Sequence, residues 1–287
     1  MKKALLSAAL SLALAGLAVP AFAGPVILGG DDLTDHGSGD GVTNNVGWLY
    51  IEKAIANLYA AQTRPGPITV DVVALGASNP GSYIPSHAGS AILSAATALG
   101  RSVSFFDGAA NINNFFAGLA AGTINPAILW IAGTNAASGS DLDSAEGAAL
   151  TANAMAINNF VGSGGGLMAH GSGAVAYGWL FALLPGLVEN QVCTGAGATL
   201  TPAGQAAFPG LSNSDIDEIC HSSFTGNFGG LTTLGLDGNG RSFIIGASGV
   251  GGGSITTPPS GVPEPASLAL LGIGLLGLAA SRRNRFF

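Results

Sequence analysis

The sequence predicts an α/β fold, in which a mostly parallel central sheet carries helices on both faces and a hydrophobic helix follows at the C-terminus. Two observations favour this fold class. Short apolar runs alternate five times with longer segments of helical character, which is the signature of a parallel sheet joined by crossover helices. The apolar runs are continuous, without regular polar interruptions, as is typical of strands covered on both faces.

The predicted strands are bounded by glycine and other turn-forming residues. The five parallel strands are expected over residues 25–29, 68–75, 102–106, 127–131 and 165–169. Farther along the chain, residues 237–240 read Asp-Gly-Asn-Gly, a strong turn signal. The apolar runs at 231–236 and 242–245 flank this turn, and they predict a hairpin that completes the sheet.

Helices are predicted in the intervals between these strands. They cover residues 46–61, 87–99, 111–120 and 144–161. His87 precedes or caps the second of them, and Asp141 or Asp143 is expected to pair with Glu146 in a capping arrangement that opens the last. Residues 188–228 depart from this rhythm, because they are rich in loop-forming residues and contain both cysteines.

The N-terminus has the pattern of an export signal. Two lysines precede an apolar core at residues 4–19, and Ala-Phe-Ala at the end of the segment fits a small-residue cleavage site, so a signal peptide is predicted over residues 1–23. The α/β domain is expected over residues 24–248. A Gly/Ser/Thr/Pro-rich linker, flexible by composition, follows at residues 249–261.

The C-terminus combines a short proline-flanked motif, an apolar segment and a basic tail. The apolar segment at residues 266–280 contains one polar residue, Ser267. As a helix it rises about 22 Å, at ~1.5 Å per residue, whereas the hydrocarbon core of a bilayer is roughly 30 Å thick. The arginines that follow would hold the chain end on the cytoplasmic side. We therefore predict a transmembrane helix that serves as a temporary anchor.

The order of these three parts resembles the PEP-CTERM sorting signal of Gram-negative bacteria. The residues that carry the resemblance are Val262, Pro263, Glu264, Pro265, Arg282 and Arg283. The resemblance implies export, a transient stay in the inner membrane, recognition by an exosortase and cleavage near the motif. It further implies delivery to the cell surface or to an extracellular polymer matrix. A plain single-span membrane anchor is the alternative interpretation.

Acidic side chains dominate the part of the chain that is expected to be exported. Residues 24–262 hold fifteen acidic and four basic side chains, which gives a formal charge of −11. Because nucleic-acid binding needs a basic footprint, this charge excludes nucleic acid as a partner. The charge is compatible with cation binding or with a purely solubilising role.

Cys193 and Cys220 are the two cysteines of the chain. An even number of cysteines in an exported protein predicts a disulfide. A bridge between these residues would close a loop of about 27 residues, which is worth roughly 3 kcal/mol in the chain-entropy treatment. Two free, buried thiols are the alternative.

Polar residues follow every predicted parallel strand. Since ligands of open α/β sheets bind beyond the carboxyl ends of the strands, these ends predict a cleft along one edge. The expected catalytic residues are His170, Asp31 and Asp107, and acid–base chemistry requires that they converge within hydrogen-bond reach. The expected ligand-binding residues are Asp32, Asn79, Thr134, Asn135 and Ser172. The alternative is that these loops are polar only because turns require such residues.

His170 is the most distinctive of these residues, and it has three possible roles. It suits a general base, a metal ligand, or a structural histidine that hydrogen-bonds the backbone and holds its loop. Carboxylates also cluster after the first strand, at Asp31, Asp32, Asp35 and Asp40. Such a loop suits calcium, although its spacing is not that of an EF-hand. No other metal and no organic cofactor is expected.

Residues 158–173, followed by Tyr177, Trp179 and the Leu-Pro-Gly of residues 184–186, resemble the ThuA-like branch of the class I glutamine amidotransferase-like superfamily. The resemblance implies a flavodoxin-like three-layer sandwich with a cleft at the fifth strand, where His170 is the matching site residue. True amidotransferases carry a cysteine at the elbow, and this chain has none there. Glutaminase activity is therefore not expected.

These patterns predict an exported, surface- or matrix-sorted protein whose α/β domain binds a ligand without catalysis, with an extracellular polysaccharide as a candidate ligand. The expected partners are the exosortase, the export machinery and, transiently, the membrane. A hydrolase or sugar-modifying enzyme that uses His170 is a second hypothesis. A passive structural matrix protein is a third.

Overall fold

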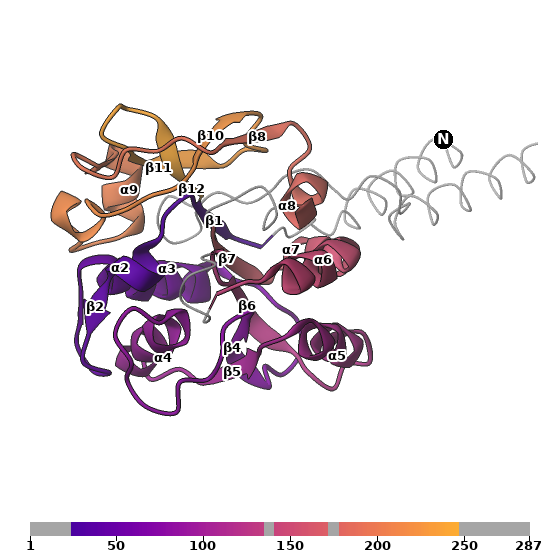
Figure 1. The fold of residues 1–287 in the computed structure, drawn as a ribbon. Coiled ribbons are helices and arrows are strands. Elements are labelled where there is room, and N and C mark those ends of the chain that lie inside the picture. The colour runs from indigo at the N-terminus through magenta and orange to yellow at the C-terminus, as the bar shows by residue number, and fades with distance from the viewer. Residues whose placement is uncertain (1–23, 135–140, 172–177, 247–287) are drawn as a thin grey trace, which may run out of the picture. The chain divides into compact units, whose positions relative to one another are not determined.

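The computed structural model describes residues 24–134, 141–171 and 178–246. These residues form a layered α/β domain (Figure 1). The predicted signal peptide, the linker, the sorting motif and the hydrophobic helix at 266–280 lie outside the described residues. Within the described ranges, no helix combines the length and the apolar character needed to cross a bilayer.

An eight-stranded sheet forms the centre of the domain, in the order β5-β4-β6-β7-β1-β12-β11-β9. The first five strands in this order are mutually parallel. They agree with the five predicted runs: β1 (Val26–Gly29), β4 (Val70–Leu75), β5 (Val103–Phe106), β6 (Pro126–Ile131) and β7 (Gly166–His170).

Three antiparallel strands extend the sheet beyond β1. The predicted hairpin is present as β11 (Thr232–Leu236) and β12 (Ser242–Gly246), and β12 pairs with β1. A short strand, β9 (Thr199–Leu200), pairs with β11 at the edge. The fold is therefore a mixed α/β sandwich with a mostly parallel sheet.

The strand order is consistent with a flavodoxin-like fold. Counted from β4, the strands β5-β4-β6-β7 follow the order 2-1-3-4, and β1 takes the fifth position beside β7. Ile27 in β1 pairs with Met168 on one side and with Gly246 on the other. β1 is thus hydrogen-bonded along both edges, and all four of its residues are buried.

Helices cover both faces of the sheet (Figure 1). α3 (Val46–Ala61) and α4 (Ala88–Ala98) lie on one face. α5 (Ala109–Ala120), α6 (Ser144–Ala152) and α7 (Ala154–Gly162) lie on the other, and the short α8 (Gly178–Leu183) packs against α6 and α7. The predicted first helix matches α3 residue for residue.

The predicted single helix over residues 144–161 is wrong in one respect, because it breaks at Asn153. The Asn153 side chain donates to the Ala149 carbonyl and to Asn113 Oδ1. Asparagine side chains compete with the backbone for such bonds, which favours a helix end over a helix interior. Two helices with a common cap residue, α6 and α7, result.

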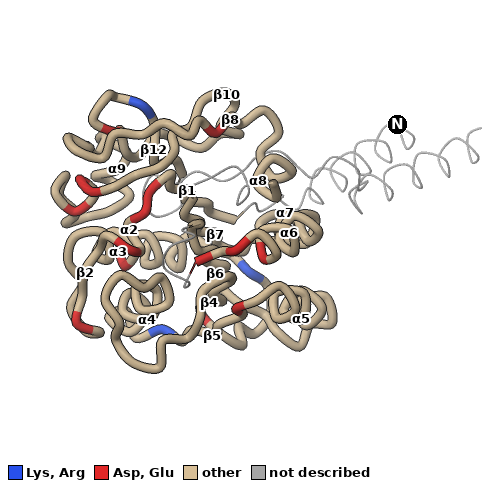
Figure 2. The backbone as a smooth tube through the Cα atoms, viewed as in Figure 1, with Lys and Arg blue, Asp and Glu red and all other residues tan. Residues whose placement is uncertain are grey.

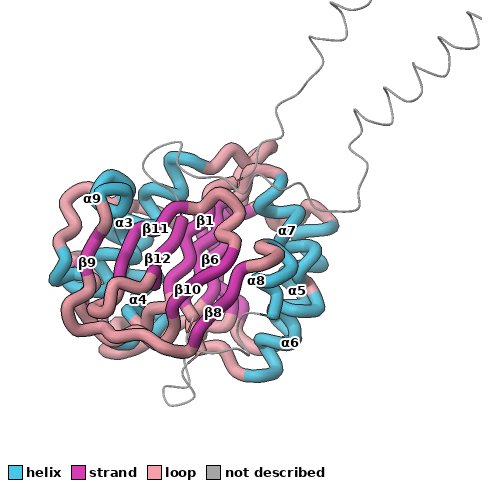
Figure 3. The backbone as a smooth tube through the Cα atoms, turned by 90° about the horizontal axis from the view of Figure 1, so that it is seen from above, coloured by secondary structure: helices cyan, strands magenta, loops and turns pink. Residues whose placement is uncertain are grey.

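Residues 187–226 form a region that the sequence predicted only as loop-rich. It contains α9 (Pro202–Ala207), a 3-10 turn at Asn213–Asp215, and a two-stranded ribbon of β8 (Leu187–Asn190) and β10 (Ser223–Gly226). The ribbon packs over β12, as the view from above shows (Figure 3). Near the start of the chain, α2 (Leu33–His36) and a hairpin of β2 (Ser38–Gly39) and β3 (Asn44–Asn45) lie beside α3.

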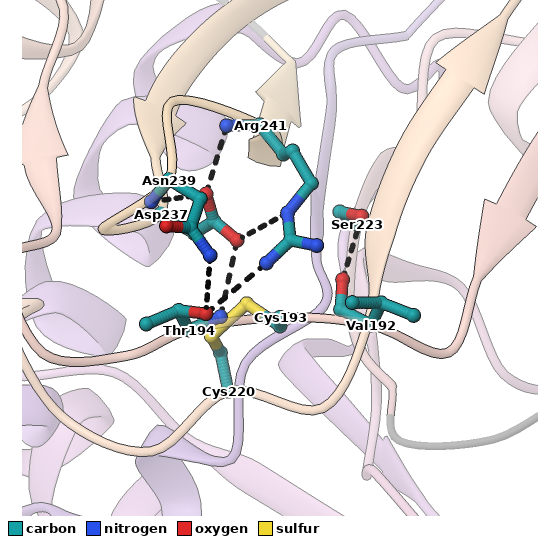
Figure 4. Close-up of polar contacts among 8 residues, drawn as sticks. All are labelled: Val192, Cys193, Thr194, Cys220, Ser223, Asp237, Asn239 and Arg241. Carbon is teal, nitrogen blue, oxygen red and sulfur yellow. Dashed lines mark hydrogen bonds and ion pairs between the residues drawn. A yellow bond between two sulfur atoms is a disulfide. The ribbon is translucent and has the colours of Figure 1, made fainter.

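The predicted disulfide between Cys193 and Cys220 is confirmed, with the two Cα atoms 5.6 Å apart. The disulfide closes the loop that connects β8 to β10 (Figure 4). Next to Cys193, the Thr194 N–H donates to Asp237 Oδ2, and Arg241 Nε donates to the same oxygen at 2.8 Å. The disulfide loop is therefore tied to the turn between β11 and β12.

Candidate functional site

The carboxyl ends of the five parallel strands meet at one edge of the sheet, and most of the predicted site residues lie there. Asp31 and Asp32 follow β1, His170 ends β7, and Asp107 follows β5. Asn79 follows β4 and Thr134 follows β6. Asn135 and Ser172 lie outside the described residues. Acidic residues also gather where β1 ends and where α6 begins (Figure 2).

His170 is held by the two strands that flank it. Its Nδ1 lies 2.7 Å from Asp31 Oδ1, just beyond β1, and its Nε2 lies 3.1 Å from the indole nitrogen of Trp130 on β6. An indole N–H is only a donor, so Nε2 must be the acceptor. The proton of the neutral imidazole is then on Nδ1, which donates to Asp31.

The surroundings of His170 leave its ring no access to solvent. Its side chain is 0% exposed, and so is that of Asp31. The ring of Tyr50, on α3, stands edge-on to the imidazole with the centroids 6.3 Å apart. Because both ring nitrogens are engaged, neither is available for proton transfer or for a metal ion in this geometry. The arrangement favours the structural interpretation of His170, in which the side chain joins β6, β7 and β1.

The two carboxylate oxygens of Asp31 differ in their contacts. Its Oδ1 also accepts the Leu33 N–H at 3.2 Å, whereas its buried Oδ2 has no hydrogen-bond partner in the part of the chain that the structure describes. Oδ2 packs against Gly29, where an added Cβ would lie 1.6 Å from it. Glycine is therefore required at position 29 by this close approach.

A second carboxylate, Asp32, receives two histidines. His221 Nε2 lies 2.9 Å from Asp32 Oδ2, and His36 Nε2 lies 3.4 Å from the same oxygen. Unlike His170, both imidazoles reach the surface, with side chains 40% and 37% exposed. The hydrogen bond to Asp32 raises the pKa of His221; partial burial opposes this effect, and the negative charges of Asp32, Asp31 and Asp35 add to it. Neither of these two histidines is among the catalytic or ligand-binding residues that the sequence predicted.

The backbone explains why Asp32 and His221 meet. The Asp32 N–H donates to the Ile219 carbonyl, and the His221 N–H donates to the Gly30 carbonyl. Asp31 and Cys220 form an isolated antiparallel bridge. The loop after β1 is therefore fastened to the loop that the disulfide closes, and the two loops together present the exposed histidines.

The carboxylates of the predicted calcium loop do not converge on one point. Asp31 faces His170, Asp32 faces the two histidines, and Asp40 accepts the N–H groups of Val42 and Thr43 within its own turn. Those N–H groups, Thr43 first, lower the pKa of the exposed Asp40 carboxyl. Across the described ranges, no group of three or more histidine, cysteine, aspartate or glutamate side chains has the arrangement of a metal site.

Asp107 is not brought together with His170 and Asp31. It follows β5, which is four positions from β1 in the sheet and therefore about 19 Å away at ~4.8 Å per strand. A second carboxylate at this end of the sheet belongs to Glu146, which accepts the Gly108 N–H at 2.6 Å and the Asp143 N–H at 2.8 Å. Glu146 N donates in return to Asp143 Oδ1, so the predicted capping arrangement is confirmed with Asp143 as the cap.

Burial raises the pKa of Glu146 above its ordinary value. The hydrogen bonds from the Asp143 and Gly108 N–H groups oppose the rise, and the charges of Asp143 and Asp107 add to it. Glu146 has a defined structural task, since it caps α6 and fixes the loop after β5. Its position at the sheet edge is accounted for by these contacts.

The chain changes direction between β4 and β6, and open α/β sheets bind ligands at such a switch point. Two described residues that follow β4 and β6 pack together there. Leu142 packs against Gly76, where φ is +74° and an added Cβ would lie 2.2 Å from the Leu142 side chain. Asn79 Oδ1 accepts the Gly81 N–H within its own turn. The contacts of Asn79 are thus local.

Comparison with known families identifies the C-terminus. Residues 261–283 match the PEP-CTERM protein-sorting motif, a range that includes all six predicted sorting residues. The motif supports export through the membrane to the cell surface and sorting by an exosortase. The chain matches no curated protein and no solved structure. The similarity of the central domain to ThuA-like proteins is not confirmed by these comparisons.

Proposed function

We propose that this protein is an exosortase cargo of a Gram-negative bacterium, which passes through the inner membrane, is cleaved near its PEP-CTERM motif and is delivered to the cell surface or to an extracellular polymer matrix. The observation that supports the sorting step is the motif match at residues 261–283. The disulfide agrees with this destination, since disulfides persist in oxidising compartments outside the cytosol.

We further propose that the α/β domain acts by binding a ligand and not by catalysis. The observation that carries this part is the engagement of both His170 nitrogens inside the core, by Asp31 and by Trp130. These contacts support a structural role for the residue that best suited a catalytic base from the sequence. A glycan of the extracellular polymer is the ligand class that fits the destination.

One observation favours a catalytic alternative. His221 is half-exposed and is oriented by the buried carboxylate of Asp32, which is the geometry of a general base with its orienting group. In this alternative the domain is a hydrolase that uses His221 in place of His170. Hydrolysis of a chromogenic acetyl ester by the exported protein, lost in His221→Gln and kept in His170→Gln, would favour it.

Two variants and cell fractionation test the sorting step. Deleting residues 262–287 should remove the protein from the membrane fraction and from the cell surface. Replacing Pro263, Glu264 and Pro265 by alanine leaves the apolar segment intact, and it should give an unprocessed chain that stays in the membrane. A wild-type protein that is itself unprocessed and membrane-bound would contradict the proposal and support the plain anchor.

A further inference from the structure

We infer that the domain has a binding site for a single neutral sugar ring in a small hollow beside Tyr83. The hollow has a volume of about 140 Å³, and none of the predicted site residues lines it. It is lined by Gly41, Tyr83, Ser90, Leu93, Ser94 and Thr97. This inference rests on the proposed binding function and gives it a ligand class and a place.

Three separate segments build the hollow. Gly41 comes from the tip between β2 and β3, Tyr83 comes from the loop between β4 and α4, and the other four residues lie on α4. Ser94 Oγ donates to Asn44 Oδ1 at 2.7 Å, which fixes the β2–β3 hairpin against α4. Ser90 Oγ accepts the Ile84 N–H at 3.0 Å, which fixes the loop against the same helix. The walls are therefore held together by the residues that line them.

The ring of Tyr83 packs against a buried aromatic residue. It stands edge-on to Trp48, with ring centroids 5.5 Å apart. Trp48 is fully buried, and its indole N–H donates to the Thr34 carbonyl at 2.8 Å. His87 caps α4 by accepting the Ser90 N–H, which anchors the end of the loop that carries Tyr83. A ring held this way loses little conformational freedom when a ligand packs on it.

Tyr83 is nonetheless 42% exposed, and apolar side chains beside it are exposed as well. Val42, next to Gly41, is 72% exposed, and Ile84, next to Tyr83, is 41% exposed. The hydroxyl groups of Tyr83 and Thr97 have no hydrogen-bond partner among the residues that the structure describes. The hollow therefore offers an aromatic ring and free hydroxyl groups, and exposed apolar residues adjoin two of its lining residues in the sequence.

The chemistry of the lining selects the ligand class. None of the six lining residues carries a charge, although the domain as a whole is strongly acidic. A charged ligand would find no partner of opposite charge here, whereas a purely apolar ligand would leave the hydroxyl groups unpaired. A sugar ring has an apolar C–H face that packs on an aromatic ring and hydroxyl groups that pair with those of the protein. Drug-sized ligands need roughly 300–1,000 Å³, so the size of the hollow limits the ligand to about one ring.

Saturation-transfer NMR on the full-length protein, in a detergent without a sugar headgroup, tests the inference. The probes are the methyl glycosides of glucose, galactose, mannose and N-acetylglucosamine, with glucuronate as a charged comparison. At least one neutral glycoside should bind in a saturable manner, and glucuronate should bind more weakly than its neutral counterpart. Binding should also change the fluorescence of Trp48, because its ring contacts Tyr83.

Variants locate the site. Tyr83→Ala should weaken binding about tenfold, since it removes the aromatic face, and Tyr83→Phe should retain most of the affinity. Thr97→Val should weaken binding about threefold through one lost hydrogen bond. The matched control is Phe181→Ala, which removes an aromatic ring of nearly equal exposure, 41%, from α8, outside the hollow. It should leave affinity unchanged, and thermal unfolding verifies that each variant is folded.

Two results would overturn the inference. If Tyr83→Ala binds a glycoside as well as the wild type does, the sugar site lies elsewhere and the proposed binding function stands without this hollow. If the folded wild-type protein binds none of the neutral glycosides, the ligand class is wrong. The sorting step is tested separately, by fractionation, and neither result affects it.

Discussion

His170, the last residue of β7, and Asp31, two residues beyond the end of β1, are joined by a 2.7 Å hydrogen bond in the solvent-free core. The bond crosses from one parallel strand to its neighbour at the edge where this fold usually places ligands. The indole of Trp130 occupies the other imidazole nitrogen from the strand on the opposite side. A polar network thus holds together three adjacent strands at the point where a catalytic base was expected.

The Trp130–His170 bond should contribute measurably to stability. Trp130→Phe removes the indole donor and leaves His170 Nε2 buried without a partner, which should lower the free energy of unfolding by about 1–3 kcal/mol beyond the effect of lost volume. Trp179→Phe is a matched control, because Trp179 is equally buried and its indole nitrogen has no hydrogen-bond partner within the described ranges. Chemical denaturation measures both. Equal losses in the two variants would mean that the hydrogen bond contributes nothing.

The disulfide should stabilise the domain by restricting its unfolded state. Replacing Cys193 and Cys220 together by serine should lower the free energy of unfolding by roughly 3 kcal/mol. Mass spectrometry after alkylation, with and without reductant, gives an independent check on the wild-type protein. Label on Cys193 of the native protein without reductant would show that the bridge is absent.

The ionised carboxylate of Asp237 should stabilise the same region. Burial opposes its ionisation, but hydrogen bonds from the backbone and side chain of Arg241 and from the N–H groups of Thr194 and Asn239 outweigh this effect and lower the pKa of Asp237 (Figure 4). The stability that this carboxylate provides is present above pH 3.8, the ordinary value, and is lost as the pH falls through the lower pKa of the folded state.

Asp237→Asn should therefore lower the free energy of unfolding at neutral pH by about 2–3 kcal/mol, since it weakens charge-assisted hydrogen bonds to a buried group. Asp217→Asn is the control. Asp217 also accepts two backbone N–H groups, those of Gly197 and Ala198, but it is exposed. Its replacement should have a smaller effect at the same pH. A larger loss for Asp217→Asn than for Asp237→Asn would contradict this account.

The stability of the protein should depend on pH through His221. The hydrogen bond to Asp32 raises the pKa of His221 in the folded state above 6.5, so folding favours the protonated imidazole. This contribution is complete below pH 6.5 and is lost as the pH rises through the folded-state pKa. His221→Gln should remove that part of the pH dependence, which thermal unfolding of both proteins between pH 5 and 9 would reveal. Parallel profiles for the two proteins would mean that the histidine does not respond to Asp32.

The local structure was largely predictable because it follows from short-range patterns. The continuous apolar runs located five parallel strands, and the Asp-Gly-Asn-Gly turn located the β11–β12 hairpin. Asp143 with Glu146 correctly indicated the start of α6. The break at Asn153 was missed because the apolar pattern continues across it. One of the hydrogen bonds that favour the break is donated by the Asn153 side chain to Asn113 on another helix, which a local pattern does not reveal.

The candidate site was less predictable because it depends on which strands are neighbours. Nothing in the pattern of β1 indicates that it lies between β7 and β12. That placement decides that His170 meets Asp31, whereas Asp107 lies four strands from Asp31. Trp130 could have indicated a buried hydrogen bond at this place, since its indole is the one side-chain hydrogen-bond donor of an otherwise aliphatic strand. The meeting of His221 with Asp32 required the path of a long irregular loop, which no local pattern encodes.

Processing and sorting by an exosortase can be tested by the intact mass of the protein recovered from the cell surface or the medium. We expect a chain that begins after the signal peptide, carries an intact disulfide and ends near residues 262–265. A surface form that retains the apolar segment and the basic tail through Phe287 would rule out this processing.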